Sequence, residues 1–435
     1  MLKSRIFSLI LLSLVLIYLF GCAEKKPSDP FTNLPVPAGE IQTLSFASLY
    51  TGGDTRNVNV YLPYGYDASI LYPVVYLLHG FGGDENSWIN EFEVNRVMDA
   101  LIAYGTIKPT IVVMPNGYSD LGGSFYTNSI DDDPVRRSMD PNPRGFGYYE
   151  YYIVGAPGTA GQDPNSVMGF VESKYNIDPA RRAIEGHSMG GYGAMKLALL
   201  HPDLFVSVAA HSGPLAFTQI LDDPASNLMQ RVAIENPGYS TVRLAEAAAK
   251  RSTHVVTLFM FGMAAAFSPH FGTPGSYDTQ NPFDTDSTDN YQYIVSEIPG
   301  DTGATGSPLD DIFPGVDLPV TLDGQGNVDT VTAVWQKWLA QDVSTLILNP
   351  TINPYFNIDL SAFGKLNIYF DCGLYDDYDP MDDGLGIGLI SQNDKFHDVL
   401  DGAGIDHTYV KYSGAHSDAV YQRIDDAMKH HNTVF

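Results

Sequence analysis

The sequence contains one serine whose neighbours can make it a nucleophile. Ser188 is the central residue of GHSMG, a G-x-S-x-G pattern. Residues 182–185 before it are typical of a short strand, and residues 189–200 after it are typical of a helix. A sharp strand-to-helix turn presents a serine hydroxyl at the N-terminus of the helix, and only small residues at the two glycine positions let strand and helix approach so closely. The pattern therefore predicts that Ser188 is a nucleophile.

A serine nucleophile needs a base, and the base needs a carboxylate that orients it. His416 follows an expected strand at residues 407–412, and Asp376 and Asp377 follow another expected strand. Loops at these strand ends lie at the same edge of a parallel sheet, which is the edge where such sheets hold their sites. We expect His416 to be the base and Asp376 the acid, with Asp377 as the alternative acid. Asp371 is expected to end its strand or to support the loop.

The negative charge that develops during attack on a carbonyl needs two convergent backbone N–H groups. One is expected from Met189, which directly follows the nucleophile. The other is expected from the glycine-rich segment 79–83 (HGFGG), which follows a buried apolar run. Within this segment, we expect the N–H group of Phe81 to complete the oxyanion hole.

The elements that must position these residues alternate between strand and helix along much of the chain. Hydrophobic patterns predict strands over residues 58–62, 73–78, 110–114, 182–185, 206–210, 366–370 and 407–412. Helical spacing predicts helices over residues 91–104, 167–175, 189–200, 332–340, 395–400 and 419–430. This alternation predicts an α/β fold with a mostly parallel sheet that is covered by helices.

The alternation stops after Pro214 and resumes near residue 366. We expect residues 215–350 to form a cap-like insertion over the carboxyl ends of the strands, where sheets of this kind bind ligands. Within it, residues 244–249 are expected to be helical. The apolar run from Val255 to Phe267 is expected to form the core of the insertion, or alternatively to line a substrate pocket.

Several of these segments together resemble the putative esterase family of α/β-hydrolases, which includes esterase D (S-formylglutathione hydrolase), feruloyl esterases and mycolyltransferases. The resemblance is carried by the strings VNVYLPYGY, PVVYLLHGFGGDENSW, IVVMPNGYSDLGGSFYTNS, GHSMGGYGAMKLALLHPDLF, IYFDCGLYDDYD and YSGAH. It covers residues 57–214 and 366–416 and implies an α/β-hydrolase fold. Position by position, it implies Ser188 as nucleophile, Asp376 as acid and His416 as base, with Phe81 and Met189 in the oxyanion hole.

The same resemblance implies pocket-lining roles for Trp88, Asn116 and Tyr126, although each residue could equally be structural. The sequence departs from the family at the insertion 215–350, which is longer than in a typical esterase. It also has Asp418 and Ala419 after the expected base, where an aromatic residue often follows. Because cap and rim residues decide what fits a site, these departures leave the substrate open.

The first residues predict export. Two positive residues precede an apolar run at residues 6–20 that is too short for a comfortable membrane span, as in a signal peptide. Residues 19–22 resemble a bacterial lipobox, which predicts a lipoprotein signal peptide over residues 1–22 with lipidation of Cys22. An uncleaved apolar anchor is the alternative. Residues 23–40 are expected to be a linker and residues 41–435 the hydrolase domain, so the enzyme would be tethered to the bacterial cell envelope or be extracellular.

Charge and motif content exclude several function classes. The formal net charge of -27 disfavours binding to nucleic acid, because an anionic surface repels phosphates. The sequence contains no zinc-type Cys/His spacing, P-loop or dinucleotide-binding fingerprint, so we expect no cofactor and no metal. Alternating carboxylates at residues 284–289, and more weakly at residues 131–134, are compatible with Ca²⁺, but they are more typical of solvated acidic loops.

These inferences together predict a secreted serine carboxylic ester hydrolase that acts through an acyl-enzyme. Its expected substrates are extracellular esters, such as feruloyl or acetyl groups attached to polysaccharide. An acyltransferase that uses the same triad is the alternative, and a surface binding lipoprotein with an inactive triad is a third hypothesis. The sequence does not specify the acyl group, the alcohol or the oligomeric state.

Overall fold

The computed structural model describes residues 36–119, 121–130, 146–222, 228–238, 254–271, 291–293, 314–322, 325, 327–376 and 387–435. Apart from Val36, these residues belong to one structural unit, Pro37–Phe435. None of the helices in this described part of the chain combines the length and the apolar character that a membrane span requires.

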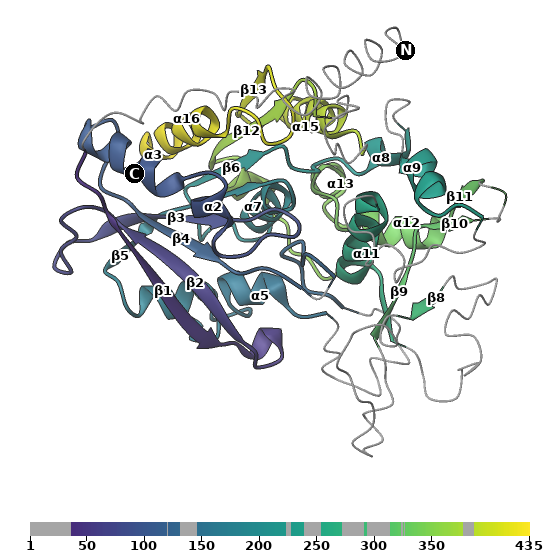
Figure 1. The fold of residues 1–435 in the computed structure, drawn as a ribbon, viewed down its shortest axis with the longest axis horizontal. Coiled ribbons are helices and arrows are strands. Elements are labelled where there is room, and N and C mark those ends of the chain that lie inside the picture. The colour runs from purple at the N-terminus through teal and green to yellow at the C-terminus, as the bar shows by residue number, and fades with distance from the viewer. Residues whose placement is uncertain are drawn as a thin grey trace, which may run out of the picture. The chain divides into compact units, whose positions relative to one another are not determined.

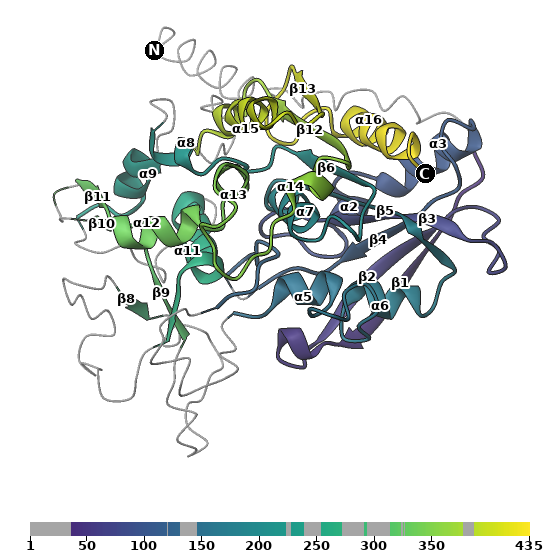
Figure 2. The ribbon, with the colours of Figure 1, turned by 180° about the vertical axis from the view of Figure 1, so that it is seen from behind.

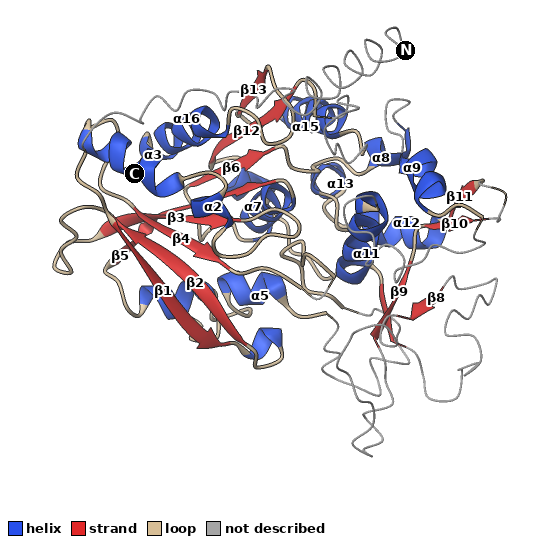
Figure 3. Ribbon diagram, in the orientation of Figure 1, coloured by secondary structure: helices blue, strands red, loops and turns tan. Residues whose placement is uncertain are grey.

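Eight strands form the main sheet, in the order β1-β2-β4-β3-β5-β6-β12-β13 (Figures 1 and 3). Their bounds are β1 Glu40–Ala47, β2 Thr55–Leu62, β3 Tyr72–Leu78, β4 Ile111–Pro115, β5 Ile177–His187, β6 Ser207–His211, β12 Asn367–Gly373 and β13 Thr408–Tyr412. The β1–β2 and β2–β4 pairs are antiparallel, and all other neighbours in this sheet are parallel. The predicted mostly parallel sheet is confirmed.

The central strands are buried because helices cover both faces of the sheet. Every residue of β3 (YPVVYLL) and β4 (IVVMP) is buried, as expected of strands with no solvent-facing side. Alternate residues of β6 serve the two faces: Ala209 packs with Ala427 on one side, whereas Val208 and Ala210 belong to the larger core on the other.

Several helices of the described residues lie before β6 or after β12 in the chain. They are α2 Ser87–Asn90, α3 Val94–Ala103, α5 Tyr149–Val154, α6 Val167–Glu172, α7 Met189–Leu200, α15 Leu389–Ala403 and α16 Val420–Asn432, with a 3-10 turn, η1, at Leu49–Thr51. Helix α16 lies beside α3 and contacts β6 and β12 (Figure 1). Helix α7 packs on β3, β5 and β6 and is buried along almost its whole length.

Most predicted elements are present with altered ends. The helix expected at residues 91–104 is preceded by a separate short helix, α2, and α3 begins only after Glu93, which has a left-handed φ of 47°. The strand expected at residues 182–185 extends over the whole of β5. Strand β1 was not predicted. Strand β1 begins at Glu40, the last residue of the expected linker, and pairs with β2 along its full length.

Between β6 and β12 the chain forms elements outside the main sheet. They are α8 Thr218–Asp222, α9 Leu228–Glu235, α11 Val255–Phe267, β7 Pro269–Phe271, β8 Tyr291–Tyr293, β9 Pro314–Asp317, β10 Val320–Leu322, β11 Val328–Thr330, α12 Thr332–Leu339, α13 Val343–Leu348 and α14 Leu360–Phe363. Helices α9, α11 and α12 lie together, on the side of α13 away from β1 and β2 (Figures 1 and 2). The apolar run at residues 255–267 is a single buried helix, α11. The helix expected at residues 244–249 lies outside the described residues.

Candidate active site

Ser188 lies on a strained turn between β5 and α7. Its backbone has φ 57° and ψ -120°, a conformation that residues with a side chain rarely adopt. Its N–H donates to the carbonyl of His211 at 2.8 Å, and the residue is only 5% exposed. A Cβ atom on Gly186 would lie 2.1 Å from the carbonyl oxygen of Gly190, and one on Gly190 would lie 2.0 Å from that of Leu78. The turn therefore requires glycine at both positions, as the G-x-S-x-G pattern predicts.

His416 and Asp376 form a hydrogen bond beside this turn. The Nδ1–H group of His416 donates to Asp376 Oδ1 at 2.7 Å. The His416 ring also packs against that of His187, the neighbour of Ser188, with 4.6 Å between centroids. An imidazole with Nδ1 protonated has its lone pair on Nε2, which is the atom that a general base uses. The alternative acid, Asp377, lies outside the described residues.

The surroundings of Asp376 keep it ionised. Its side chain is fully buried, while that of His416 is 24% exposed. Burial by itself raises the pKa of Asp376, but the adjacent His416 imidazole and the hydroxyl of Ser212 outweigh this effect and lower the pKa to about 2. The thiol of Cys372 donates to the second carboxylate oxygen at 3.3 Å. A carboxylate held in this way can accept the hydrogen bond from His416 Nδ1–H at any ordinary pH.

Arg423 connects the loop of the expected base to the sheet. Its guanidinium donates to Asp371 Oδ1 at 2.9 Å through Nε, to the Ser212 hydroxyl at 3.0 Å, and to the backbone carbonyl of His416 at 3.0 Å. Arg423 and Asp371 are both buried. Because one rigid guanidinium bonds three segments of chain, it fixes the position of the loop that carries His416.

Buried charges continue from Asp371 across the sheet. Asp371 Oδ2 accepts from His211 Nδ1 at 2.8 Å, and His211 Nε2 donates to Glu185 Oε1 at 2.9 Å. The other oxygen of Glu185 accepts from His431 Nε2 at 3.2 Å. Burial lowers the pKa of His211, but the two carboxylates outweigh it and raise that pKa to about 9. His211 is therefore a buried imidazolium at neutral pH.

The sequence analysis did not identify this buried polar network. Asp371 was expected to end its strand or to support its loop, but it lies inside β12 and its carboxylate pairs with His211 and Arg423. Glu185, His211, Arg423 and His431 were assigned no role. The available signal was that Glu185 is a charged residue at the end of a strand predicted to lie in a sheet covered by helices. A buried charge requires a partner, but the pattern alone does not say which residue supplies it.

The segment that contains Phe81 is held by bonds from its neighbours. The imidazole of His79 accepts from Gly117 N–H at 2.8 Å through Nε2 and donates to the carbonyl of Gly80 through Nδ1. Burial lowers the pKa of His79 to about 4, which agrees with this neutral, two-bond arrangement. Within the described ranges, the N–H groups of Phe81 and Met189 have no hydrogen-bond acceptor. Both are therefore available as donors to an oxyanion.

The ring of Phe81 contacts the insertion. It packs edge-to-face on Phe259 of α11, with 5.4 Å between ring centroids. A Cβ atom on Gly262, one turn further along α11, would lie 2.5 Å from the Phe81 ring. The buried helix α11 therefore belongs to the main hydrophobic core and also supports the loop that carries the candidate oxyanion donor.

The three residues with expected pocket-lining roles make contacts with neighbouring protein groups. Trp88 is 1% exposed and packs between Phe92 and His211. Tyr126 is fully buried, and its hydroxyl donates to the carbonyl of His79 at 3.1 Å. The side-chain amide of Asn116 donates to Glu85 at 2.7 Å, and its oxygen accepts from the N–H of Tyr118. These contacts give the three residues a structural role in the surrounding loops, and their pocket-lining role stays a prediction.

Metal-binding geometry occurs away from this site. Within the described ranges, the side chains that could together hold a metal ion are His397, Asp401 and His407. The acidic segments at residues 284–289 and 131–134, which the sequence suggested as possible Ca²⁺ ligands, lie outside the described residues.

A family model and several known proteins match this chain in sequence. The family model described as "Putative esterase" matches residues 50–424. An endo-1,4-beta-xylanase/feruloyl esterase of Xylanibacter ruminicola is 31% identical over 193 residues, which cover 43% of this chain and 23% of that protein. Endo-1,4-beta-xylanase Y of Acetivibrio thermocellus is 27% identical over 268 residues, which cover 60% of this chain and 22% of that protein. The chain thus corresponds to less than a quarter of the length of these two relatives.

Solved structures give a looser likeness. A ferulic acid esterase superposes with a TM-score of 0.49 at 18% identity, covering 92% of this chain and 99% of that one. The S-formylglutathione hydrolase of Agrobacterium tumefaciens superposes with a TM-score of 0.46 at 16% identity, covering 92% and 97%.

The family match extends from before β2 into α16, and so includes the Ser188 turn, the Asp376 loop and the His416 loop. The strand order and the strand-to-helix serine turn are those of an α/β-hydrolase. The resemblance and the fold class expected from the sequence are both confirmed. This chain belongs to the family described as putative esterases, within the α/β-hydrolase fold.

Proposed function

We propose that this protein hydrolyses carboxylic esters through a covalent acyl-enzyme on Ser188. The observation that carries the proposal is the 2.7 Å hydrogen bond from His416 to a buried, ionised Asp376, beside a serine held at φ 57°. Membership of the esterase family supports it.

In the first half of the reaction, Ser188 Oγ attacks the ester carbonyl and His416 Nε2 takes the hydroxyl proton. Asp376 stays ionised and stabilises the imidazolium that forms. The N–H groups of Phe81 and Met189 donate to the oxyanion of the tetrahedral intermediate. When the intermediate collapses, His416 returns the proton to the departing alcohol, and the acyl group remains on Ser188.

In the second half, water replaces the alcohol. His416 takes a proton from the water as its oxygen attacks the acyl carbonyl, and the same two N–H groups stabilise the second intermediate. Collapse returns the proton to Ser188 Oγ and releases the carboxylic acid. The enzyme is then back in its starting state.

The decisive variant is Ser188→Ala. It is expected to lower kcat for p-nitrophenyl acetate by at least ~10⁴-fold, because no acyl-enzyme can form. The matched control is Ser69→Ala, at an exposed serine, which should keep full activity. A fluorophosphonate probe should add one mass increment to the wild type and none to Ser188→Ala. Normal turnover by a folded Ser188→Ala protein would refute the proposal.

For the substrate class, we propose hydroxycinnamoyl esters of polysaccharides. The proposal is supported by the relative named endo-1,4-beta-xylanase/feruloyl esterase, which this chain matches over part of its length. The test compares kcat/KM for methyl ferulate, p-nitrophenyl acetate, a long-chain ester and acetyl-xylan. Methyl ferulate is expected to give the highest value. A preference for the long-chain ester or for acetyl-xylan would contradict this choice.

We further propose that the protein is exported and anchored by lipid at Cys22. Support comes from the positive residues, apolar run and lipobox-like segment at the start of the sequence. Cells that express the protein should incorporate labelled palmitate into it, and Cys22→Ala should abolish the label. If Cys22→Ala and wild type carry the same label, the anchor is elsewhere or absent.

A further inference from the structure

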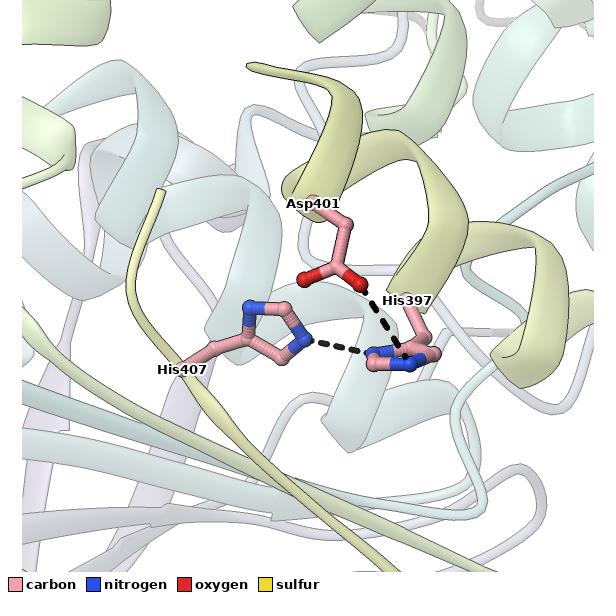
Figure 4. A group of neighbouring side chains, drawn as sticks. All are labelled: His397, Asp401 and His407. Atoms are coloured by element: carbon pink, nitrogen blue, oxygen red, sulfur yellow. Dashed lines mark hydrogen bonds and ion pairs between the residues drawn. The ribbon is translucent and has the colours of Figure 1, made fainter. Parts of the chain in front are cut away.

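Three potential metal ligands converge where α15 meets the start of β13. His397 and Asp401 are one turn apart on α15, and His407 immediately precedes β13 (Figure 4). One ligand atom from each of the three side chains lies within 4.8 Å of the other two. The chain returns between helix and strand at residues 404–406, so the two elements that supply the ligands are neighbours in sequence as well as in space.

The hydrogen bonds of His407 orient its lone pair into this group. Its Nδ1 lies 2.9 Å from the backbone carbonyl of Ile405, which can only accept, so Nδ1 carries the proton. Its Nε2 is then an acceptor, and it points to His397 Nδ1 at 2.7 Å (Figure 4). Histidines that bind metals characteristically donate the other ring N–H to a backbone carbonyl in this way.

Packing against aromatic residues also fixes the two imidazoles. The ring of His407 stacks on Phe370 of β12, with 5.6 Å between centroids and planes 22° apart. The His397 ring lies 5.4 Å from that of Tyr409. His397 and Asp401 remain accessible, with side chains 40% and 65% exposed. An ion from solvent can therefore reach a ligand set that is already partly oriented.

We propose that His397, Asp401 and His407 bind a divalent transition-metal ion of the Zn²⁺ class. Two imidazoles and one carboxylate match the ligand preferences of Zn²⁺, and water would occupy the fourth tetrahedral position. Zinc–nitrogen bonds of about 2.0 Å place two tetrahedral nitrogens about 3.3 Å apart. The two imidazole nitrogens therefore separate by about 0.6 Å on binding, which a small rotation of the accessible His397 side chain provides.

The ion would fasten α15 to β13. His407 precedes β13 and His416 follows it, so the metal group and the candidate catalytic base lie at opposite ends of a strand about 13 Å long. The bound ion therefore stabilises the elements that lead to the catalytic loop and takes no part in ester cleavage. The proposal does not depend on the proposed esterase activity.

The test is zinc binding by the full chain after treatment with a chelator, measured by titration calorimetry. Wild type is expected to bind one more equivalent of Zn²⁺ than Asp401→Asn, His397→Gln or His407→Gln. The matched control is His201→Gln, at a histidine that pairs with Glu150 elsewhere, and it should bind as wild type does. Asp401→Asn is the variant least expected to misfold, because Asp401 is exposed whereas His397 and His407 are only partly exposed.

Two further measurements distinguish a metal ion that links α15 to β13 from a hydrogen bond between the two imidazoles. Zn²⁺ should raise the thermal midpoint of the wild type and leave that of the three ligand variants unchanged. Co²⁺ in place of Zn²⁺ should give the visible absorption of a tetrahedral site in the wild type alone. Equal Zn²⁺ stoichiometry in wild type and Asp401→Asn, or no binding by the wild type, would overturn the proposal and leave a hydrogen bond between His397 and His407.

Discussion

At Ser188 a single residue carries backbone strain that its neighbours maintain. A non-glycine residue at φ 57° and ψ -120° is destabilised by about 1–3 kcal/mol, and such strain persists only where the surrounding structure holds it. Here the Ser188 N–H is bonded to the His211 carbonyl of the adjacent strand, and Gly186 and Gly190 allow β5 and α7 to meet. This strained conformation places the Ser188 hydroxyl at the start of the buried helix α7.

The identity of the acid can be tested at two adjacent residues. Asp376→Asn is expected to lower kcat by ~10⁴-fold, because an amide stabilises neither the required His416 tautomer nor the imidazolium. Asp377→Asn is the matched control and should retain near-normal kcat. The kcat of each variant is measured with p-nitrophenyl acetate. The opposite pattern, with loss of activity only in Asp377→Asn, would transfer the role of the acid to Asp377.

At the scale of elements, helix α11 of the insertion and the loop of Phe81 form one packed unit. Gly262 leaves no room for a side chain, because its Cβ would lie 2.5 Å from the Phe81 ring. Displacement of that ring also moves the backbone N–H that we propose as an oxyanion donor. We therefore expect packing of α11 on Phe81 to affect the proposed reaction.

Substitution of two helical glycines tests this coupling. Gly262→Ala is expected to lower kcat by about 10-fold, a fraction of the ~10²–10³-fold loss that follows complete removal of an oxyanion donor. Gly402→Ala in α15 is the matched control, because a Cβ there would meet no atom within 4 Å. It should keep its activity and gain up to about 1 kcal/mol in stability. Equal kcat values for the two variants would disprove the coupling.

Helix α16 acts on the site through Arg423. Arg423→Gln leaves part of the buried Asp371 charge uncompensated and frees the carbonyl of His416, so the free energy of unfolding should fall by about 3 kcal/mol or more. At a temperature where the variant is folded, we expect lower kcat with little change in KM, because a displaced base affects the chemical step.

Two further variants separate positioning by Arg423 from a purely structural role. Arg423→Lys should restore part of kcat, since it keeps the charge but not the three-way geometry. Arg96→Gln, at a surface arginine paired with Glu93, should change neither constant. An Arg423→Gln enzyme that is less stable but has normal kcat would show that the residue only stabilises the fold.

At the scale of the whole molecule, buried charges join strands that are distant in sequence. The network runs from His431 through Glu185, His211 and Asp371 to Arg423, and so connects β5, β6, β12 and α16. Removal of one member leaves its partner charged and buried, which is costly. The network therefore couples the stability of the sheet to the protonation of His211.

This coupling predicts how stability depends on pH. The pKa of His211 is about 9 in the folded protein and about 6.5 in the unfolded chain. The contribution of His211 to the free energy of unfolding is therefore fully present below pH 6.5 and is lost as the pH rises towards about 9. Urea unfolding of the wild type at constant ionic strength should show this decline between those pH values. Glu185→Gln, which removes one of the two carboxylates, should shift the decline to lower pH.

The difference between wild type and variant is the quantity that isolates His211. Burial lowers the pKa of Lys196 to about 7. The titration of Lys196 therefore raises the free energy of unfolding as the pH rises above about 7, which is opposite to the effect of His211. The Lys196 contribution is common to both proteins and cancels in the comparison. Coincident pH profiles for wild type and Glu185→Gln would show that His211 is not the group responsible.

The sequence predicted the parts of the fold and site that depend on residues close together in the chain. The turn at Ser188 follows from the two glycines around it, and buried strands such as β3 follow from continuous apolar runs. The pairing of His416 with Asp376 was also foreseen, because both residues follow strands that end at one edge of the sheet. Strand β1 was missed because most of its residues are exposed or half-buried, so it lacks the continuous apolar run of the central strands.

What the tertiary structure alone decided is which distant residues meet. Trp88 and Tyr126 are buried, and the sequence did not show that Trp88 packs on His211 or that Tyr126 bonds the carbonyl of His79. Glu185 is bonded to His431, 246 positions away, because strand order and register bring β5 next to the segment that α16 covers. The convergence of His397 with His407 likewise depends on how α15 returns onto β13. Local pattern determines the type of each element, whereas the pairing of buried charges and ligands is set by three-dimensional packing.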